Sequence, residues 1–212
     1  MKSPSLGLLL HLAAAQAATA ATLEISFKDA REAPVDDVAV WVMPKSGPAP
    51  IGKREAAIAQ KDKTFVPLVT IIQTGTPVQF PNMDPIRHHV YSFSPPKPFE
   101  IKLYAGTPVA PIVFDKPGEV VLGCNIHDHM LAFVYVVDTP WFAKSKNGMV
   151  RIENLPAGDY LLHLAHYRQT APIPPTPFSA RADENVARAV ALSLKPAPAI
   201  PPGTPPSTVN PK

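Results

Sequence analysis

A succession of short apolar segments separated by turn residues constrains the fold of this chain more than any other feature. Between Phe65 and Val137, segments rich in β-branched and aromatic residues recur at short intervals, with turn signals such as Gly75 and Pro117–Gly118 between them. Strands at this spacing are typical of a sandwich or barrel. Because no convincing long amphipathic helix interrupts them, we expect an all-β protein.

The flanks of this region continue the same pattern. Leu23–Phe27 alternates as a half-buried strand does, Val38–Met43 reads as a second strand, and Met149–Leu164 reads as a hairpin with a Pro/Gly turn. The stretch from Gly52 to Lys63 is ambiguous, because it contains helix formers but is short. It is compatible with a short helix or with a loop that contains one strand.

One short stretch, Gly123 to Met130, concentrates side chains that bind metals. It holds the only cysteine, two of the seven histidines and one of the five methionines. Cys124, His127 and Met130 have the spacing C-x-x-H-x-x-M, directly before the apolar run Leu131–Val137. Thiolate, imidazole and thioether together favour copper or another thiophilic ion, and one more imidazole would complete the His2Cys set with a weak axial methionine that is typical of electron-transfer copper sites.

Each of these residues also has an ordinary interpretation. A lone cysteine is usually a small buried hydrophobe, Met130 could belong to the core, and His129 could be a surface side chain. The conjunction of the spacing with a distant histidine pair, His88 and His89, favours a metal site. Only one of two consecutive strand residues can point into the site. We expect His88 to be the ligand, and His89 is the alternative.

The N-terminus predicts export. Lys2 precedes an apolar run from Leu6 to Ala15, and small-x-small patterns follow by Ala20, as in a cleaved signal peptide. The apolar run is shorter than the roughly 20 residues that span a bilayer, so we expect a periplasmic protein with no membrane anchor after cleavage. Lys2 is the only charged residue removed, which leaves 19 basic and 17 acidic side chains. This near balance argues against nucleic acid as a partner.

Several motifs in order give a resemblance to a known family. They are F-P-N-x-D, H-H-V-Y-S-F-S, F-E-I-K-L-Y-x-G, F-D-x-P-G, G-C-N-I-H-D-H-M and V-V-D-T-P-W-F-A, from about Phe65 to Ala143. This region resembles the exported cupredoxin-like methylamine utilization proteins, and its ligand loop is similar to the short loop of amicyanin. The resemblance implies a cupredoxin-like Greek-key β-sandwich.

The same resemblance implies one type-1-like copper ion held by His88, Cys124, His127 and Met130. The family pattern usually has Asn after the first histidine, where it braces the ligand loop, but this chain has His89 there. Either Asn82 or Asn125 supplies the brace, or His89 faces the metal.

The flanks give a second resemblance. Leu23–Pro44 and Asn147–Leu164, with G-x-x-x-I-x-x-L-P-A-G-x-Y-x-L, resemble the two ends of a carboxypeptidase-regulatory-like, transthyretin-type sandwich. The copper domain would then be inserted in, or packed on, a second small β-sandwich. The expected division is a signal peptide at 1–20, flanking strands at 21–64, the copper domain at 65–143, a flanking hairpin and strand at 144–195, and a Pro-rich disordered tail at 196–212.

These observations predict a periplasmic blue copper protein that carries single electrons and is not an enzyme. The expected partners are an amine dehydrogenase or oxidase and a c-type cytochrome, and the oligomeric state stays open. No Ser-hydrolase elbow, zinc-protease motif or phosphate-binding loop is present in the sequence. The alternatives are a periplasmic copper-binding or delivery protein, and a non-catalytic β-sandwich binding module.

Overall fold

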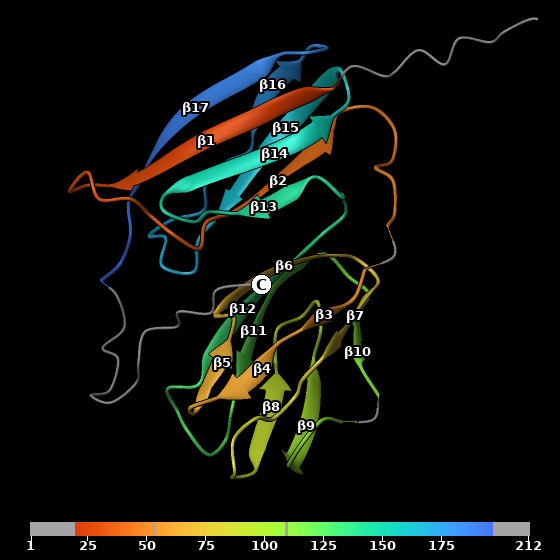
Figure 1. The fold of residues 1–212 in the computed structure, drawn as a ribbon, viewed down its shortest axis with the longest axis vertical. Helices are drawn as coiled ribbons and strands as arrows, with labels where there is room; N and C mark the ends of the chain where they lie inside the picture. The colour runs from red at the N-terminus through yellow and green to blue at the C-terminus, as the bar shows by residue number, and fades with distance from the viewer. Residues whose placement is uncertain (1–19, 53, 109, 197–212) are drawn as a thin grey trace, which may run out of the picture.

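The computed structural model describes residues 20–52, 54–108 and 110–196, and every regular element in these ranges is a β-strand (Figure 1). The all-β prediction is therefore confirmed. The predicted signal peptide, up to residue 19, and the Pro-rich tail, from residue 197, lie outside the described residues. No helix with the length and apolarity to cross a membrane occurs in the described ranges.

Two β-sandwiches, one above the other in Figure 1, make up the described chain. The first, called the flanking domain here, packs two sheets of order β14-β1-β17 and β13-β2-β15-β16 against each other. Their strands are β1 (Ala21–Asp29), β2 (Ala39–Pro44), β13 (Phe142–Lys144), β14 (Met149–Leu155), β15 (Gly158–Ala165), β16 (Thr176–Ala180) and β17 (Asn185–Leu192).

Alternation along β1 shows why this sandwich forms. Leu23, Ile25 and Phe27 are buried while the residues between them are partly exposed, as period-two side chains require. They enter one apolar core with residues of β2, β14 and β15. The first and last described strands, β1 and β17, pair in parallel.

The second sandwich, called the site domain here, contains the remaining strands. Its main sheet has the order β6-β12-β11-β8-β9, and smaller sheets of order β10-β7-β3 and β4-β5 pack with it around a separate apolar core. The strands are β3 (Ala56–Ala57), β4 (Ala59–Lys61), β5 (Thr64–Val66), β6 (Val69–Gln73), β7 (Thr76–Gln79), β8 (His88–Ser92), β9 (Phe99–Tyr104), β10 (Ile112–Phe114), β11 (Gly118–Gly123) and β12 (Leu131–Val137).

The site domain is an insertion in the flanking domain. The chain leaves the flanking domain after β2, builds β3 to β12, and returns in β13, which pairs antiparallel with β2 at Trp41 and Phe142. A small apolar cluster joins the two domains. It contains buried Ala39, Val69 and Tyr135, and the ring of Phe133 stacks on that of Tyr167 at 4.8 Å.

The boundaries of the insertion differ from those expected from the sequence. Residues 56–61, assigned above to the flanking domain, form β3 and β4 of the site domain, because β3 pairs with β7 and Ile58 is buried in the site-domain core. They contain no helix. At the other end, Phe142–Lys144 pairs with β2 and so belongs to the flanking domain.

Candidate metal centre

The loop 124–130 connects the antiparallel strands β11 and β12, whose ends pair at Gly123 and Leu131. Cys124 and Met130 therefore stand at the two sides of the loop base, and both are buried in the site-domain core. The amide of Met130 donates to the carbonyl of His127 at 2.9 Å and closes the second half of the loop as a turn. The spacing C-x-x-H-x-x-M thus places a thiol and a thioether at the loop base and an imidazole near its tip.

Strand β8 brings His88 to this loop. Its first residue is His88, and β8 pairs with β11 at Tyr91 and Gly123, directly before Cys124. One ligand atom each from His88, Cys124 and His127 lies within 4.8 Å of the other two. The Cys124 Sγ is 4.0 Å from His88 Nδ1, and the rings of His88 and His127 are 5.2 Å apart. The structure thus brings these three predicted ligands together.

The two ring nitrogens of His88 face different partners. Nδ1 faces the Cys124 sulfur, while Nε2 lies 2.7 Å from Asp84 Oδ2. Because an ionised carboxylate only accepts hydrogen bonds, the Nε2 atom carries the proton and Nδ1 keeps its lone pair for a ligand. His88 has no exposed surface, so this orientation is fixed by packing as well as by the bond.

His89 points away from this cluster, because successive strand side chains face opposite sides of a sheet. Its Nδ1 bonds to the side-chain nitrogen of Asn125 at 2.7 Å, and its Nε2 lies 3.0 Å from Glu100 Oε1 without the alignment of a hydrogen bond. Asn125 directly follows Cys124. The pair His89–Asn125 therefore ties the ligand loop to β8, and His89 takes a bracing position rather than a ligand position.

Asn82 braces the other loop of the site. Its side-chain amide donates to the carbonyls of Ile86 and Tyr104 at 2.8 and 3.0 Å, and its side-chain oxygen accepts from the amide of Asp84 at 3.0 Å. These bonds shape the segment that carries Asp84 and His88. Both asparagines named as candidate braces thus make bonds at the site, one on each loop.

His127 has a buried ring nitrogen that no described residue satisfies. Its Nδ1 is buried and has no hydrogen-bond partner among the described residues. Desolvation, together with nearby positive charge such as that of Lys63, holds the pKa of His127 below its ordinary value, which favours the neutral ring that a metal requires. An imidazole with a buried, unpaired nitrogen, close to a thiol and to a second imidazole, fits a soft or borderline metal ion.

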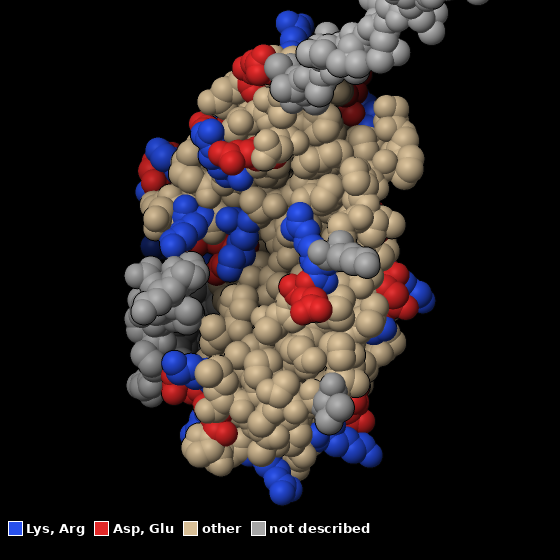
Figure 2. Space-filling view, turned by 45° about the vertical axis from the view of Figure 1, so that its right-hand side comes forward, with Lys and Arg blue, Asp and Glu red and all other residues tan. Residues whose placement is uncertain are grey.

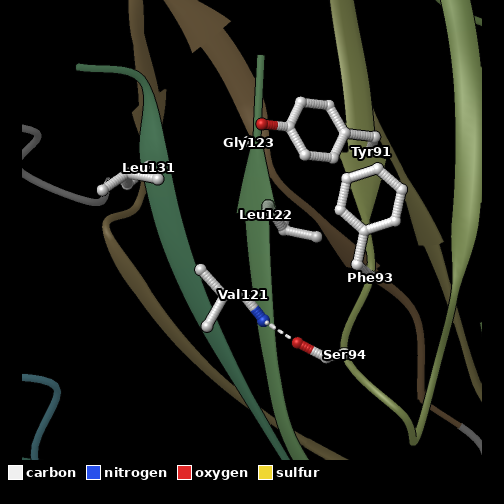
Figure 3. A pocket seen from close by; sticks show the side chains of 7 residues that line it. All are labelled: Tyr91, Phe93, Ser94, Val121, Leu122, Gly123 and Leu131. Atoms are coloured by element: carbon white, nitrogen blue, oxygen red, sulfur yellow. Dashed lines mark hydrogen bonds between the residues drawn. The ribbon is translucent and has the colours of Figure 1, made fainter. Parts of the chain in front are cut away.

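Tyr91 covers the backbone just before Cys124, as the close view of the neighbouring pocket shows (Figure 3). A Cβ atom at Gly123 would lie 2.7 Å from the hydroxyl and Cζ atoms of the Tyr91 side chain. The exposed ring of Phe93 lies beside it, with the ring centroids 5.0 Å apart, and Ser94 accepts the amide of Val121 at 2.9 Å. The absence of a side chain at Gly123 thus lets Tyr91 pack on the end of β11.

Three other histidines of the described residues, His129, His163 and His166, lie outside the cluster. His129 is exposed, with its ring 5.8 Å from that of His127. In the flanking domain, His163 stacks on Trp41 at 5.0 Å, and buried His166 accepts the amide of Arg168 at 3.1 Å. These contacts agree with packing roles for the last two.

Sequence reasoning missed one partner of the site. Asp84 ends the motif F-P-N-x-D, four residues before His88, but no role at the site was predicted for it. That short distance along the chain was the available signal. It could not reveal the contact, because a loop rather than a helix or strand brings the two side chains together.

Comparison with solved structures finds partial matches that cover less than half of this chain. A Cu-containing nitrite reductase (NirK) from Thermus scotoductus SA-01 is 27% identical over 43% of this chain, with a TM-score of 0.37, and the match spans 25% of the reductase chain. A purple cupredoxin from Nitrosopumilus maritimus is 22% identical over 39% of this chain and 99% of its own, with a TM-score of 0.34.

Amicyanin from Paracoccus versutus is 15% identical over 45% of this chain and 97% of its own length, with a TM-score of 0.34. No protein-family model matches the sequence, and no curated protein matches it. The similarity to these solved structures is therefore confined to less than half of the chain.

Proposed function

We propose that this protein binds one copper ion in a type-1 site and carries single electrons. The observation that carries the proposal is the cluster of Cys124 Sγ with one ring nitrogen each of His88 and His127, together with the unpaired, buried Nδ1 of His127. Two imidazoles and a thiolate are the equatorial set of such sites, and buried Met130 at the loop base is the candidate for the weak axial ligand. Bound there, copper would supply a one-electron redox couple.

The scaffold favours electron transfer over chemistry on a substrate. His88 begins β8 and Cys124 directly follows the adjacent strand β11, and both side chains are buried, so their geometry is set before any ion binds. Bonds from Asn125 and Asn82 hold the two loops. A site whose ligands need not move between oxidation states exchanges electrons with little reorganisation.

The surface around the two loops suits a transient protein partner. Ile126 in the ligand loop and Met83 and Ile86 in the loop before His88 are exposed apolar side chains. Much of the site domain on the face seen in Figure 2 is uncharged. We propose that a redox protein, a c-type cytochrome or an amine dehydrogenase, docks over His127, whose ring is the partly exposed ligand.

We also propose a compartment and a family for this protein. The signal-like N-terminus supports a periplasmic location. The ordered motifs support kinship with the cupredoxin-like methylamine utilization proteins, and the two-sheet flanking domain is compatible with a carboxypeptidase-regulatory-like origin.

The experiment is a visible absorption spectrum of the purified, copper-loaded protein. We expect the intense band of a Cu(II)–thiolate bond, its loss in Cys124→Ser and His88→Ala, and its persistence in His129→Ala. A colourless Cu(II) protein, or a band that survives Cys124→Ser, would contradict the proposal. Rapid loss of copper to a chelator, with preference for Cu(I), would instead indicate a copper-delivery protein.

A further inference from the structure

We propose that Asp84 is a positioning residue that fixes a negative charge behind the ligand His88 and thereby favours the oxidised metal. This inference rests on the proposed copper site. Asp84 is not one of the proposed copper ligands, because it contacts His88 at the nitrogen that faces away from Cys124.

The Asp84 carboxylate is held on both of its oxygens. The amide of Asp62 donates to Oδ1 at 2.7 Å, and the amide of Lys63 donates to Oδ2 at 2.9 Å. Both donors lie at the turn of the β4–β5 hairpin and have left-handed backbone conformations, with φ of 53° and 58°. The hairpin turn thus points two successive amides at one carboxylate, an arrangement that binds anions.

The charge is placed where water screens it poorly. The Asp84 side chain is 8% exposed and that of His88 is 0% exposed. The N–H groups of Asp62, Lys63 and His88 all point at the two Asp84 oxygens, as they do at an ionised carboxylate. Asp84 thus accepts the Nε2 proton of His88 through a charge-assisted bond.

This arrangement distinguishes the two imidazoles of the site. His88 is backed by an anion, whereas no carboxylate among the described residues bonds to His127. A carboxylate on the far nitrogen raises the basicity of a ligating histidine and fixes its ring. The added electron density and the fixed charge both stabilise the ion with the higher positive charge, so they lower the reduction potential.

The test compares Asp84→Asn with Asp128→Asn in the copper-loaded protein. The asparagine oxygen at position 84 can still accept from His88 and Lys63, so this variant removes the charge and loses only the bond from Asp62. Asp128 lies in the ligand loop but is exposed and bonds to neither histidine ligand, which makes it a matched charge control.

We expect Asp84→Asn to keep the thiolate band and to shift the equilibrium towards the reduced form about tenfold, which equals about 59 mV for a one-electron couple. Asp128→Asn should shift it less than about twofold, because exposed charges are screened. Asp84→Ala should in addition lower copper affinity by about 10–100-fold, as loss of such partners does. Equal potentials in the wild type and Asp84→Asn would overturn the inference.

A second measurement covers the case in which Asp84→Ala folds poorly. Nitrogen NMR of the metal-free wild type and Asp84→Asn should show His88 protonated at Nε2 and not at Nδ1, and the opposite tautomer in the wild type would also overturn the inference. Failure of the copper site itself is distinguishable, since it removes the thiolate band from the wild type, whereas failure of the Asp84 inference leaves that band intact.

Discussion

The hydrogen bond between His89 and Asn125 should contribute a coupling free energy whose magnitude can be estimated from its geometry. The two side chains meet at 2.7 Å, His89 is buried, and the bond joins β8 to the first residue after Cys124. A neutral hydrogen bond of this kind contributes about 0.5–1.5 kcal/mol net. We therefore expect a coupling free energy of about 1 kcal/mol in the double-mutant cycle of His89→Ala, Asn125→Ala and the double variant.

The two single variants should lose different amounts of unfolding free energy. Asn125 is exposed, so its truncation should cost little beyond the bond. His89→Ala also removes a buried ring that contacts Tyr91 edge-on at 5.8 Å, and it should cost about 2–3 kcal/mol, the lower part of the range for truncating a large buried side chain.

The assay is urea unfolding of the metal-free protein, followed through NMR resonances of β8, β11 and β12. Tryptophan fluorescence would not serve, because Trp41 and Trp141, the two tryptophans of the chain, pack in the flanking domain or at its contact with the site domain. Asn82→Ala paired with His89→Ala is the control cycle. Additivity of His89→Ala and Asn125→Ala within about 0.3–0.5 kcal/mol, the range for independent sites, would refute the bracing role.

Two further predictions concern stability. Gly148 has a φ of 69°, and a Cβ atom there would lie 2.9 Å from the Phe27 carbonyl oxygen and 2.7 Å from Pro34 Cβ. Gly148→Ala should therefore lower the free energy of unfolding by about 1–2 kcal/mol through the strained backbone conformation. Overpacking should lower it by about 1–3 kcal/mol more. Gly47→Ala, where φ is 74° and no atom lies within 4 Å, should lose only the first part; equal losses in urea unfolding would contradict the steric argument. Partial desolvation of its carboxyl raises the pKa of Glu119 although the residue is exposed, so the folded state binds its proton somewhat more tightly and loses a little stability as pH rises through the ordinary range for glutamate. Glu119→Gln should therefore raise the thermal midpoint at pH 7 relative to the wild type and leave it nearly unchanged at pH 3, and a variant with no gain at pH 7 would show that this carboxyl is solvated.

Local patterns were sufficient to predict most of the longer strands. Alternation along Leu23–Phe27 gave β1, and the apolar run Leu131–Val137 gave β12. The stretch 56–61 could not be assigned from its pattern, since its strands are very short and alanine-rich. What decides their place is pairing with Val78, about twenty residues further along the chain.

The site could be predicted only in part for the same reason. The spacing of Cys124, His127 and Met130 is local, so the sequence displayed it directly. Whether His88 or His89 faces Cys124 depends on the register between β8 and β11, which is fixed at Tyr91 and Gly123 rather than by any motif. The metal itself stays a prediction.

The pairing of β2 with β13 on either side of the insertion affects the order in which the protein can fold as the chain emerges after the export that we propose. When β2 emerges, its partners β13 and β15 have not yet followed, so the flanking sheet stays open while β3 to β12 emerge. The site domain has its own core and can close during this interval. Once folded, it holds the ends of the insertion near each other and reduces the entropy lost when β13 joins β2. The centre that we propose to hold copper would thus form before the flanking domain, whose strands β2 and β13 stand at the two ends of the insertion.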